Sequence, residues 1–206
     1  MTRAEILSAG IAEMGLSVSA MAQQKLLQYL VLLEKWNKVY NLTAVRDPEE
    51  MVVLHLLDSL SVLPYVHGKR LLDVGSGAGL PGIVIAIVTP ELEVTTIDTV
   101  QKKAIFMRQV KGELGLENLT VVHARVERYQ PAEMFDQIIS RAFSEISLFT
   151  ELTKHLLVKG GQWLAMKGVM PTQELEKLNM QPAHIFPLDV ANLKAERHLI
   201  VFENKS

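Results

Sequence analysis

The sequence predicts an α/β protein with a doubly wound, mostly parallel sheet of seven strands, preceded by a helical extension. Three observations predict this class. Short apolar runs alternate with helical segments after residue 66, a glycine-rich turn follows the first run, and the segment before residue 66 has only helical spacing. Strands separated by helices form right-handed parallel units. We therefore expect a helical extension over residues 1–65 and a sheet domain over residues 66–206.

The helical extension has recognisable helix starts. Thr2 and Glu5 have the spacing of a capping box, and a second helix with one apolar stripe follows Ser19. The clearest start is Asp47, which is followed by a proline and two glutamates. We expect this third helix to continue to about Ser61.

The sheet domain has seven predicted strands and three predicted helices. The strands are expected at residues 70–74, 93–97, 119–123, 135–140, 162–166, 184–188 and 198–202. The helices are expected at 81–88, 100–114 and 145–158, the last one ending at Gly160 and Gly161. No full helix separates the last two strands, so we expect them to pair antiparallel at one edge. Ligands of such sheets bind beyond the carboxyl ends of the parallel strands.

Composition excludes several classes of protein. The 206 residues carry 21 basic and 23 acidic side chains, a net charge of −2, which excludes a strongly basic coat protein and an acidic disordered chain. The absence of cysteine excludes disulfides, thiolate metal sites and cysteine nucleophiles. No apolar run is long enough to cross a bilayer, and the first residues do not resemble a signal peptide. A soluble, cytoplasmic protein is expected.

The strongest local motif is the glycine-rich segment from Asp73 to Gly82, where the first strand turns into a helix. Glycine is required where the backbone takes a positive φ or lies against a ligand. A dinucleotide site needs G-x-G-x-x-G directly after the strand. Gly77, Gly79 and Gly82 have that spacing, but Gly77 comes two residues after the turn begins. The match to a nicotinamide cofactor is therefore weak.

The same segment fits the acid-x-G-x-G-x-G pattern of S-adenosylmethionine sites without a shift, starting at Asp73 and including Gly75 and Gly77. Such a loop passes beneath the aminoacyl part of the cofactor, where Asp73 compensates the ammonium group. Asp98, at the end of the second strand, is placed to accept the ribose hydroxyls, although nicotinamide enzymes carry an acid there too. The competing interpretation is an ordinary turn with both acids as caps. Three alternating glycines and two strand-end acids favour the cofactor site, and hence a Rossmann-like class I methyltransferase fold.

The segment after the third strand is where this fold meets the adenine ring. Val126 offers an apolar contact there, and Glu127 adds a polar one unless it only caps a short turn.

Missing motifs restrict the methyl acceptor. Methylation at carbon 5 of a pyrimidine needs a cysteine, and the chain has none. An N-P-P-Y motif is absent after the fourth strand, and Arg141 stands where ribose methyltransferases with a Lys-Asp-Lys-Glu tetrad need an aspartate. The N7 atom of guanine remains a suitable acceptor, because its lone pair needs no general base. Transfer then requires alignment and exclusion of water.

Several motifs follow one another in an order that is hard to obtain by chance. They are Lys35-Trp36-Asn37-Lys38-Val39-Tyr40-Asn41-Leu42-Thr43, Arg46-Asp47-Pro48, His55, Asp58-Ser59, Ile139-Ser140-Arg141-Ala142 and Glu196-Arg197-His198-Leu199. With these motifs and the glycine-rich segment, the chain resembles the bacterial ribosomal RNA small subunit methyltransferase G family, also called glucose-inhibited division protein B. The resemblance covers essentially the whole chain.

The resemblance implies methylation at N7 of the guanine at position 527, in the 530 loop of 16S rRNA, with S-adenosylmethionine as the methyl donor. It places cofactor contacts on Gly75, Leu80, Val126, Glu127 and Arg141. The partner it implies is 16S rRNA or the small ribosomal subunit, and we expect a monomer.

Charge alone is a weak indication of RNA binding. Between residues 102 and 128 there are six basic and three acidic side chains. Lys167 and Arg197 are candidates for phosphate contacts, and an equally good interpretation of each is a solvated surface charge.

His55 and Asp58, three positions apart on a helix, are expected to form a structural pair. The six histidines show no metal-ligand spacing, so no metal site is predicted.

Two other functions remain open at this level. A methyltransferase that acts on a small molecule agrees with the mild net charge of the chain. A nicotinamide-binding oxidoreductase or a nucleotide sensor uses a similar glycine-rich turn.

Overall fold

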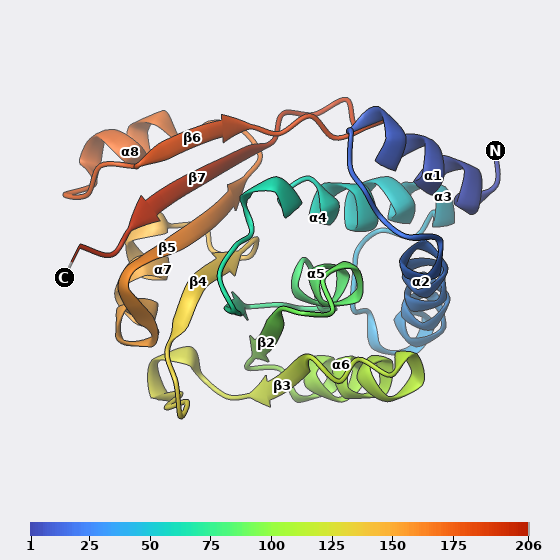
Figure 1. Cartoon of the computed structure of the whole chain (residues 1–206), viewed down its shortest axis with the longest axis horizontal. Helices are drawn as coiled ribbons and strands as arrows, with labels where there is room; N and C mark the ends of the chain where they lie inside the picture. Colours follow the sequence, from blue (N-terminus) through green and yellow to red (C-terminus); the bar gives the residue numbers. More distant parts are fainter. Residues whose placement is uncertain (206) are drawn as a thin grey trace.

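The structure is a computed structural model that describes residues 1–205, and its centre is one seven-stranded sheet in the order β3-β2-β1-β4-β5-β7-β6 (Figure 1). The pairs among β1 to β5 are parallel, and β7 is antiparallel to both β5 and β6. This confirms the predicted doubly wound sheet with an antiparallel pair at one edge. The strands are β1 (Arg70–Val74), β2 (Glu93–Asp98), β3 (Leu119–His123), β4 (Phe135–Ser140), β5 (Leu157–Lys167), β6 (His184–Pro187) and β7 (His198–Glu203).

Helices cover both faces of the sheet. In Figure 1 the helices of the N-terminal part lie on one side together with α5 and α6, and α7 and α8 lie on the other. The α-helices are α1 (Arg3–Glu13), α2 (Ala20–Tyr40), α3 (Pro48–Met51), α4 (Asp58–Leu60), α5 (Gly82–Val88), α6 (Gln101–Leu114), α7 (Ile146–Thr153) and α8 (Thr172–Lys177). Shorter turns are the π-helical η1 (Val52–Leu57) and the 3-10 turns η2 (Leu63–Tyr65), η3 (Val126–Arg128) and η4 (Lys154–Leu156).

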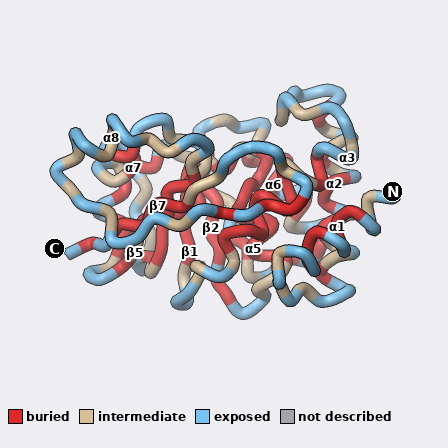
Figure 2. Tube along the Cα trace, turned by 90° about the horizontal axis from the view of Figure 1, so that it is seen from above, coloured by how far each residue is buried: buried red, intermediate tan, exposed pale blue. Residues whose placement is uncertain are grey.

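The strands are apolar on both faces because each face has its own hydrophobic core. Leu71 and Leu164 pack in the core that includes the N-terminal helices, α5 and α6. Their chain neighbours Leu72 and Trp163 pack in the core that includes α7. Successive side chains of a strand point to opposite faces, so the near-continuous apolar runs of the sequence report burial on both sides. Figure 2 shows the buried stretches running through the centre of the molecule.

The N-terminal extension packs into one of the two hydrophobic cores of the sheet domain. Buried residues of α1 and α2 belong to the same apolar cluster as residues of α5, β1 and β7. A polar contact adds to this packing: the hydroxyl of the fully buried Tyr29, in α2, donates a hydrogen bond of 2.8 Å to the carbonyl oxygen of Ala78 in the glycine-rich loop. The division of the chain between residues 65 and 66 stays a prediction.

The helix starts of the extension agree with the sequence. Thr2 and Glu5 form the capping box of α1, and the Ser19 hydroxyl caps α2. The Asp47 carboxylate accepts the amides of Glu49 and Glu50 at 2.9 Å. The third helix continues to Leu60 as predicted, but its middle part, η1, is π-helical.

The predicted helix over residues 145–158 is wrong in its second half. The α-helix α7 ends at Thr153, and Leu157 already pairs with Phe135 in the sheet. Gly160 and Gly161 do not stop a helix; they lie in an irregularity of β5, where the pairing with β4 jumps from Leu157 to Gln162. Gly160 has φ +76°, a conformation that suits a bulge as well as a helix end, so glycine alone did not distinguish the two.

The Tyr29 hydroxyl provides a test of how the extension holds the loop. Tyr29→Phe removes the hydrogen bond and leaves the buried Ala78 carbonyl without this partner. We expect the free energy of unfolding to fall by roughly 1–2 kcal/mol, measured by urea denaturation. Tyr40→Phe is the matched control, because Tyr40 is 42% exposed. Equal effects of the two substitutions would contradict a specific role of the Tyr29 hydroxyl.

Candidate functional site

The glycine-rich loop lies where β1 and β2 end side by side. Val74 pairs with Ile97 in the parallel register, and the amide of Gly75 continues the pattern by donating to the Ile97 carbonyl at 2.9 Å. Gly75, Gly77 and Gly79 have φ values of +68°, +60° and +95°, which side chains other than glycine rarely adopt. The alternating glycines are thus required by the backbone of the turn itself.

Asp73 closes this loop from below. One carboxylate oxygen accepts the Gly82 amide at 2.8 Å, while the other oxygen, Oδ1, is buried and has no hydrogen-bond partner. The side chain is fully buried. Burial raises the pKa of Asp73 to about 7, although the Gly82 hydrogen bond and the charge of Arg141 act in the opposite direction. A buried carboxyl with a free oxygen and a raised pKa is typical of a functional site.

Asp98 holds the loop from the end of β2. Its Oδ2 accepts the Gly77 amide at 2.9 Å, and its Oδ1 accepts the Val100 amide at 2.8 Å. The Lys103 ammonium lies 3.9 Å from Oδ2. Each carboxylate oxygen can accept a further hydrogen bond.

A pocket of about 370 Å³ opens at the carboxyl ends of β1 and β2, and four of the predicted cofactor residues line it: Gly75, Asp98, Val126 and Glu127. Val126 is almost fully buried. Glu127 is exposed, and a hydrogen bond from its own backbone amide lowers the pKa of its carboxyl. The lining of the pocket therefore combines apolar side chains with the carboxylates of Asp98 and Glu127.

The sequence missed several residues that line the same pocket, among them Lys103 in α6, Phe143 in the loop after β4, and Leu152 in α7. A basic residue in the first turn after the Asp98 strand end was a usable indication for Lys103. No comparable indication existed for Leu152, because the sequence does not show how far the helix that contains it lies from the first strand.

Four predicted cofactor residues do not line this pocket. Asp73 and Leu80 are buried beneath the loop, and Gly77 lies within it, bonded to Asp98. Arg141, directly after β4, is not part of the lining either: its Nη1 atom donates to the Asp58 carboxylate at 2.9 Å and to the Leu54 carbonyl at 3.0 Å.

The expected pair of His55 and Asp58 is wrong. Nε2 of His55 forms its hydrogen bond with the Thr43 hydroxyl at 3.0 Å. The Asp58 carboxylate instead pairs with Arg141 and, at 2.8 Å, with Arg197. Helical spacing placed the two residues on neighbouring positions. It did not show that the partners of the carboxylate are two arginines from the sheet domain.

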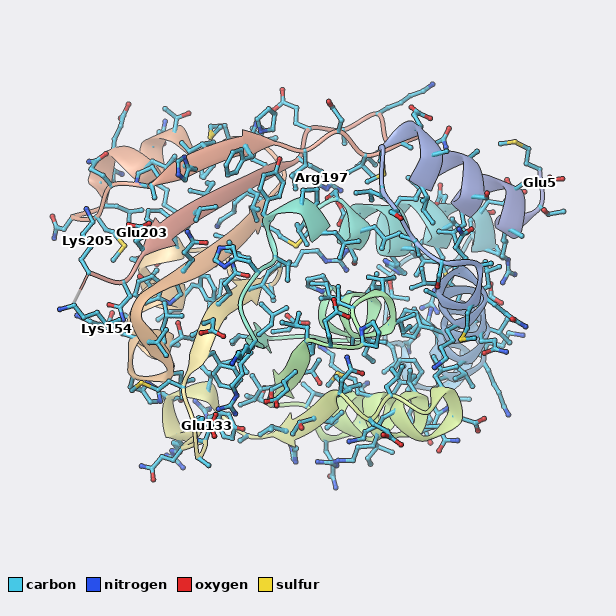
Figure 3. The ribbon with its side chains drawn as sticks, in the orientation of Figure 1. Glu5, Glu133, Lys154, Arg197, Glu203 and Lys205 are labelled. Atoms are coloured by element: carbon cyan, nitrogen blue, oxygen red, sulfur yellow. The ribbon has the colours of Figure 1, made fainter. Side chains whose placement is uncertain are left out.

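The two candidate phosphate-binding residues are both engaged within the protein. The Lys167 ammonium donates to the carbonyls of Phe143 and Ser144, at 3.1 and 2.6 Å, and lies 3.5 Å from Glu174. It therefore braces the loop that forms one wall of the pocket. Arg197 is bound to Asp58 and lies beside α4 (Figure 3).

Within residues 1–205, no three histidine or acidic side chains gather in a way that could hold a metal ion. Each helix within residues 1–205 is too short or too polar to span a bilayer.

The arrangement of sheet, loop and pocket is that of a class I methyltransferase fold. Among solved structures, the N-methyltransferase NodS from Bradyrhizobium japonicum WM9, in complex with S-adenosyl-L-homocysteine, is similar to this chain with a TM-score of 0.56 and 13% identity, over 84% of this chain and 100% of that chain. At this identity the likeness shows the fold alone.

Sequence comparison shows the family. The family model of rRNA small subunit methyltransferase G matches residues 22–200. A ribosomal RNA small subunit methyltransferase G from Methylobacillus flagellatus is 62% identical over 94% of this chain and 95% of its own length. One from Pseudomonas putida (strain GB-1) is 53% identical over 98% of this chain and 96% of its own length. The chain belongs to the rRNA small subunit methyltransferase G family.

The raised pKa of Asp73 predicts a measurable pH dependence of stability. The carboxyl binds its proton more tightly in the folded state, with a pKa of about 7 against an ordinary 3.8, so this group lowers the free energy of unfolding as the pH rises from about 4 to 7. Asp73→Asn removes the penalty. We expect the variant to be more stable than the wild type at pH 8, by on the order of 1–3 kcal/mol, with the difference closing toward pH 4.5.

Urea denaturation across this pH range measures the effect. Asp189→Asn, at an exposed position, is the control and should not change the pH profile. A stability difference between Asp73→Asn and the wild type that is the same at pH 5 and pH 8 would show that Asp73 is ionised throughout.

Proposed function

We propose that this protein transfers the methyl group of S-adenosylmethionine to N7 of the guanine at position 527 in 16S rRNA. Membership of the rRNA small subunit methyltransferase G family, matched over residues 22–200, carries the proposal. The pocket at the ends of β1 and β2 supports the choice of cofactor.

The residues around the pocket fit S-adenosylmethionine. Asp73 Oδ1 is a buried acceptor without a partner, as a group that pairs with an ammonium requires. A Cβ atom at Gly77 would have the Gly75 carbonyl oxygen as its neighbour, 4.0 Å away, so no side chain of the protein packs against this point of the loop. Asp98 retains acceptor capacity for two hydroxyls after binding two backbone amides.

We assign roles to the residues of this chain accordingly. Asp98 would hold the ribose, Val126 and Glu127 the adenine, and Gly75, Gly77 and Leu80 would form and support the floor. Asp73 and Arg141 would face the amino-acid end, one compensating the ammonium and the other the carboxylate. When bound, the cofactor supplies an electrophilic methyl group on a sulfonium.

Transfer to guanine N7 requires little acid–base chemistry from the protein, because the acceptor is already a lone pair. Burial lowers the pKa of His55, the histidine bonded to Thr43, to about 4, with the charge of Arg141 acting in the same direction. His55 is therefore neutral at pH 7 and adds no positive charge near Arg141. The contribution of the chain is to align the acceptor and to exclude water.

Lys167 and Arg197 are proposed as phosphate contacts of the RNA. Their side chains remain 12% and 24% exposed, so each keeps part of its charged group accessible while bound within the protein. The working form we propose is a cytoplasmic monomer acting on 16S rRNA or the small ribosomal subunit.

The proposal predicts the product. Purified protein incubated with labelled S-adenosylmethionine and undermethylated small ribosomal subunits should place one label on guanine N7, detected by nuclease digestion and mass spectrometry. RNA turnover should fall steeply with salt, because phosphate contacts release counterions. Label on another atom, or turnover of a small molecule that is insensitive to salt, would overturn the proposed substrate.

Gly75→Val should weaken cofactor binding. A Cβ at this position would lie 2.9 Å from the Cβ of Ala142, and the larger side chain would occupy the pocket. We expect the affinity for S-adenosylhomocysteine, measured by calorimetry, to fall by roughly tenfold or more.

The matched control is Gly15→Val. Gly15 has a similar φ of +65°, and nothing lies within 4 Å of its Cβ position, so the substitution brings the backbone strain without touching the pocket. A folded Gly75→Val variant that binds as tightly as Gly15→Val would contradict the role of Gly75.

A further inference from the structure

Asp58, the first residue of α4, joins three parts of the chain at one point. Its Oδ2 pairs with Arg141 at 2.9 Å and its Oδ1 with Arg197 at 2.8 Å. The carboxylate is buried, with 1% of the residue exposed. The two arginines lie 83 and 139 residues further along the chain, at the end of β4 and just before β7. One carboxylate therefore connects the N-terminal extension to the residues next to β4 and β7.

The π-helical turn η1 adds a second acceptor for Arg141. The amide of Asp58 donates to the carbonyls of Val53 and His55 and bypasses Leu54, its partner in a regular α-helix. The Leu54 carbonyl instead accepts Nη1 of Arg141 at 3.0 Å. The turn thus offers Arg141 a carbonyl and a carboxylate oxygen together, and π-turns of this kind are frequent at functional sites.

The position of Arg141 in the chain connects the Asp58 ion pair with the pocket. The next residue, Ala142, forms a wall of the pocket and lies directly opposite Gly75. The charge of Arg141 also acts on Asp73, the buried acid beneath the loop. Arg141 is therefore bonded to Asp58 through its side chain and adjoins the pocket wall through its chain neighbour Ala142.

The charges at this point do not cancel. Two guanidinium groups share one carboxylate, which leaves one net positive charge, and the arginine side chains are 29% and 24% exposed. Without the carboxylate, the two guanidinium groups would lose their common partner and repel each other at close range. The carboxylate thus keeps two like charges side by side.

We propose that Asp58 is a positioning residue that holds Arg141 toward the amino-acid end of the cofactor and keeps Arg197 beside it, facing the RNA. This inference rests on the proposed function. Asp58 itself contacts neither cofactor nor RNA and acts through the two arginines. The N-terminal extension, through this one side chain, becomes part of the methyl-transfer site.

The test is Asp58→Asn, which keeps the shape and removes the charge. We expect S-adenosylhomocysteine to bind the folded variant roughly tenfold more weakly by calorimetry, and the KM for small ribosomal subunits to rise. In an Arg141→Ala background, the same substitution should no longer change the affinity for S-adenosylhomocysteine, because the residue through which it acts is gone. Asp58→Glu keeps the charge and should weaken binding less than Asp58→Asn.

The matched control is Asp136→Asn. The Asp136 carboxylate accepts the amides of Lys69 and Arg70 at 2.7 and 2.9 Å, near the beginning of β1, so its loss should lower stability without changing cofactor affinity. The inference is overturned if Asp58→Asn behaves like this control, with a lower thermal midpoint and an unchanged affinity. If Asp58→Asn does not fold, Asp58→Glu decides, and wild-type affinity and KM in that variant overturn the inference. A wild-type protein that binds no S-adenosylhomocysteine overturns the proposed function itself.

Discussion

The hydrogen bond between the buried Asp73 carboxylate and the Gly82 amide is the constraint on which the site depends. It joins the end of β1 to the start of α5 and closes the loop between them. The contact requires glycine at position 82, because a Cβ there would lie 2.7 Å from both the Asp73 carboxylate and the Thr96 methyl group. Since the loop is closed at its base, its amides take fixed directions, and the Gly77 amide meets Asp98.

The N-terminal extension contributes to the site through polar contacts in addition to apolar packing. Tyr29 donates a hydrogen bond to the loop, and Asp58 pairs with Arg141 directly after β4 and with Arg197 directly before β7. Both side chains are buried, where a polar group without its partner is costly. The extension therefore has a defined position relative to the pocket, as alignment of a methyl donor and acceptor requires.

Three basic side chains at the carboxyl-end edge of the sheet are paired with oxygen atoms of the protein. Lys167, Arg141 and Arg197 each bond carbonyl or carboxylate oxygens of the protein and still remain partly exposed. Side chains held in this way lose little further entropy when they bind a ligand. Internal pairing thus keeps positive groups ordered and partly exposed in a chain with a net charge of −2.

The sequence alone determined the order of the strands and of most helices, the place of the glycine-rich loop and, through motifs along the whole chain, the family. Local rules were sufficient for the strands and the loop: strand pattern and glycine spacing are read within a few residues, and the strand runs 70–74, 119–123 and 135–140 match the structure. The proximity of Gly75 and Asp98 follows from two strand ends that parallel pairing places together. Only the tertiary structure decided the partners of Asp58, the place of Leu152 in the pocket and the bulge at Gly160. Each of these depends on contacts between segments that are distant in the chain. Helical or strand periodicity carries no information about which distant side chains form such a contact.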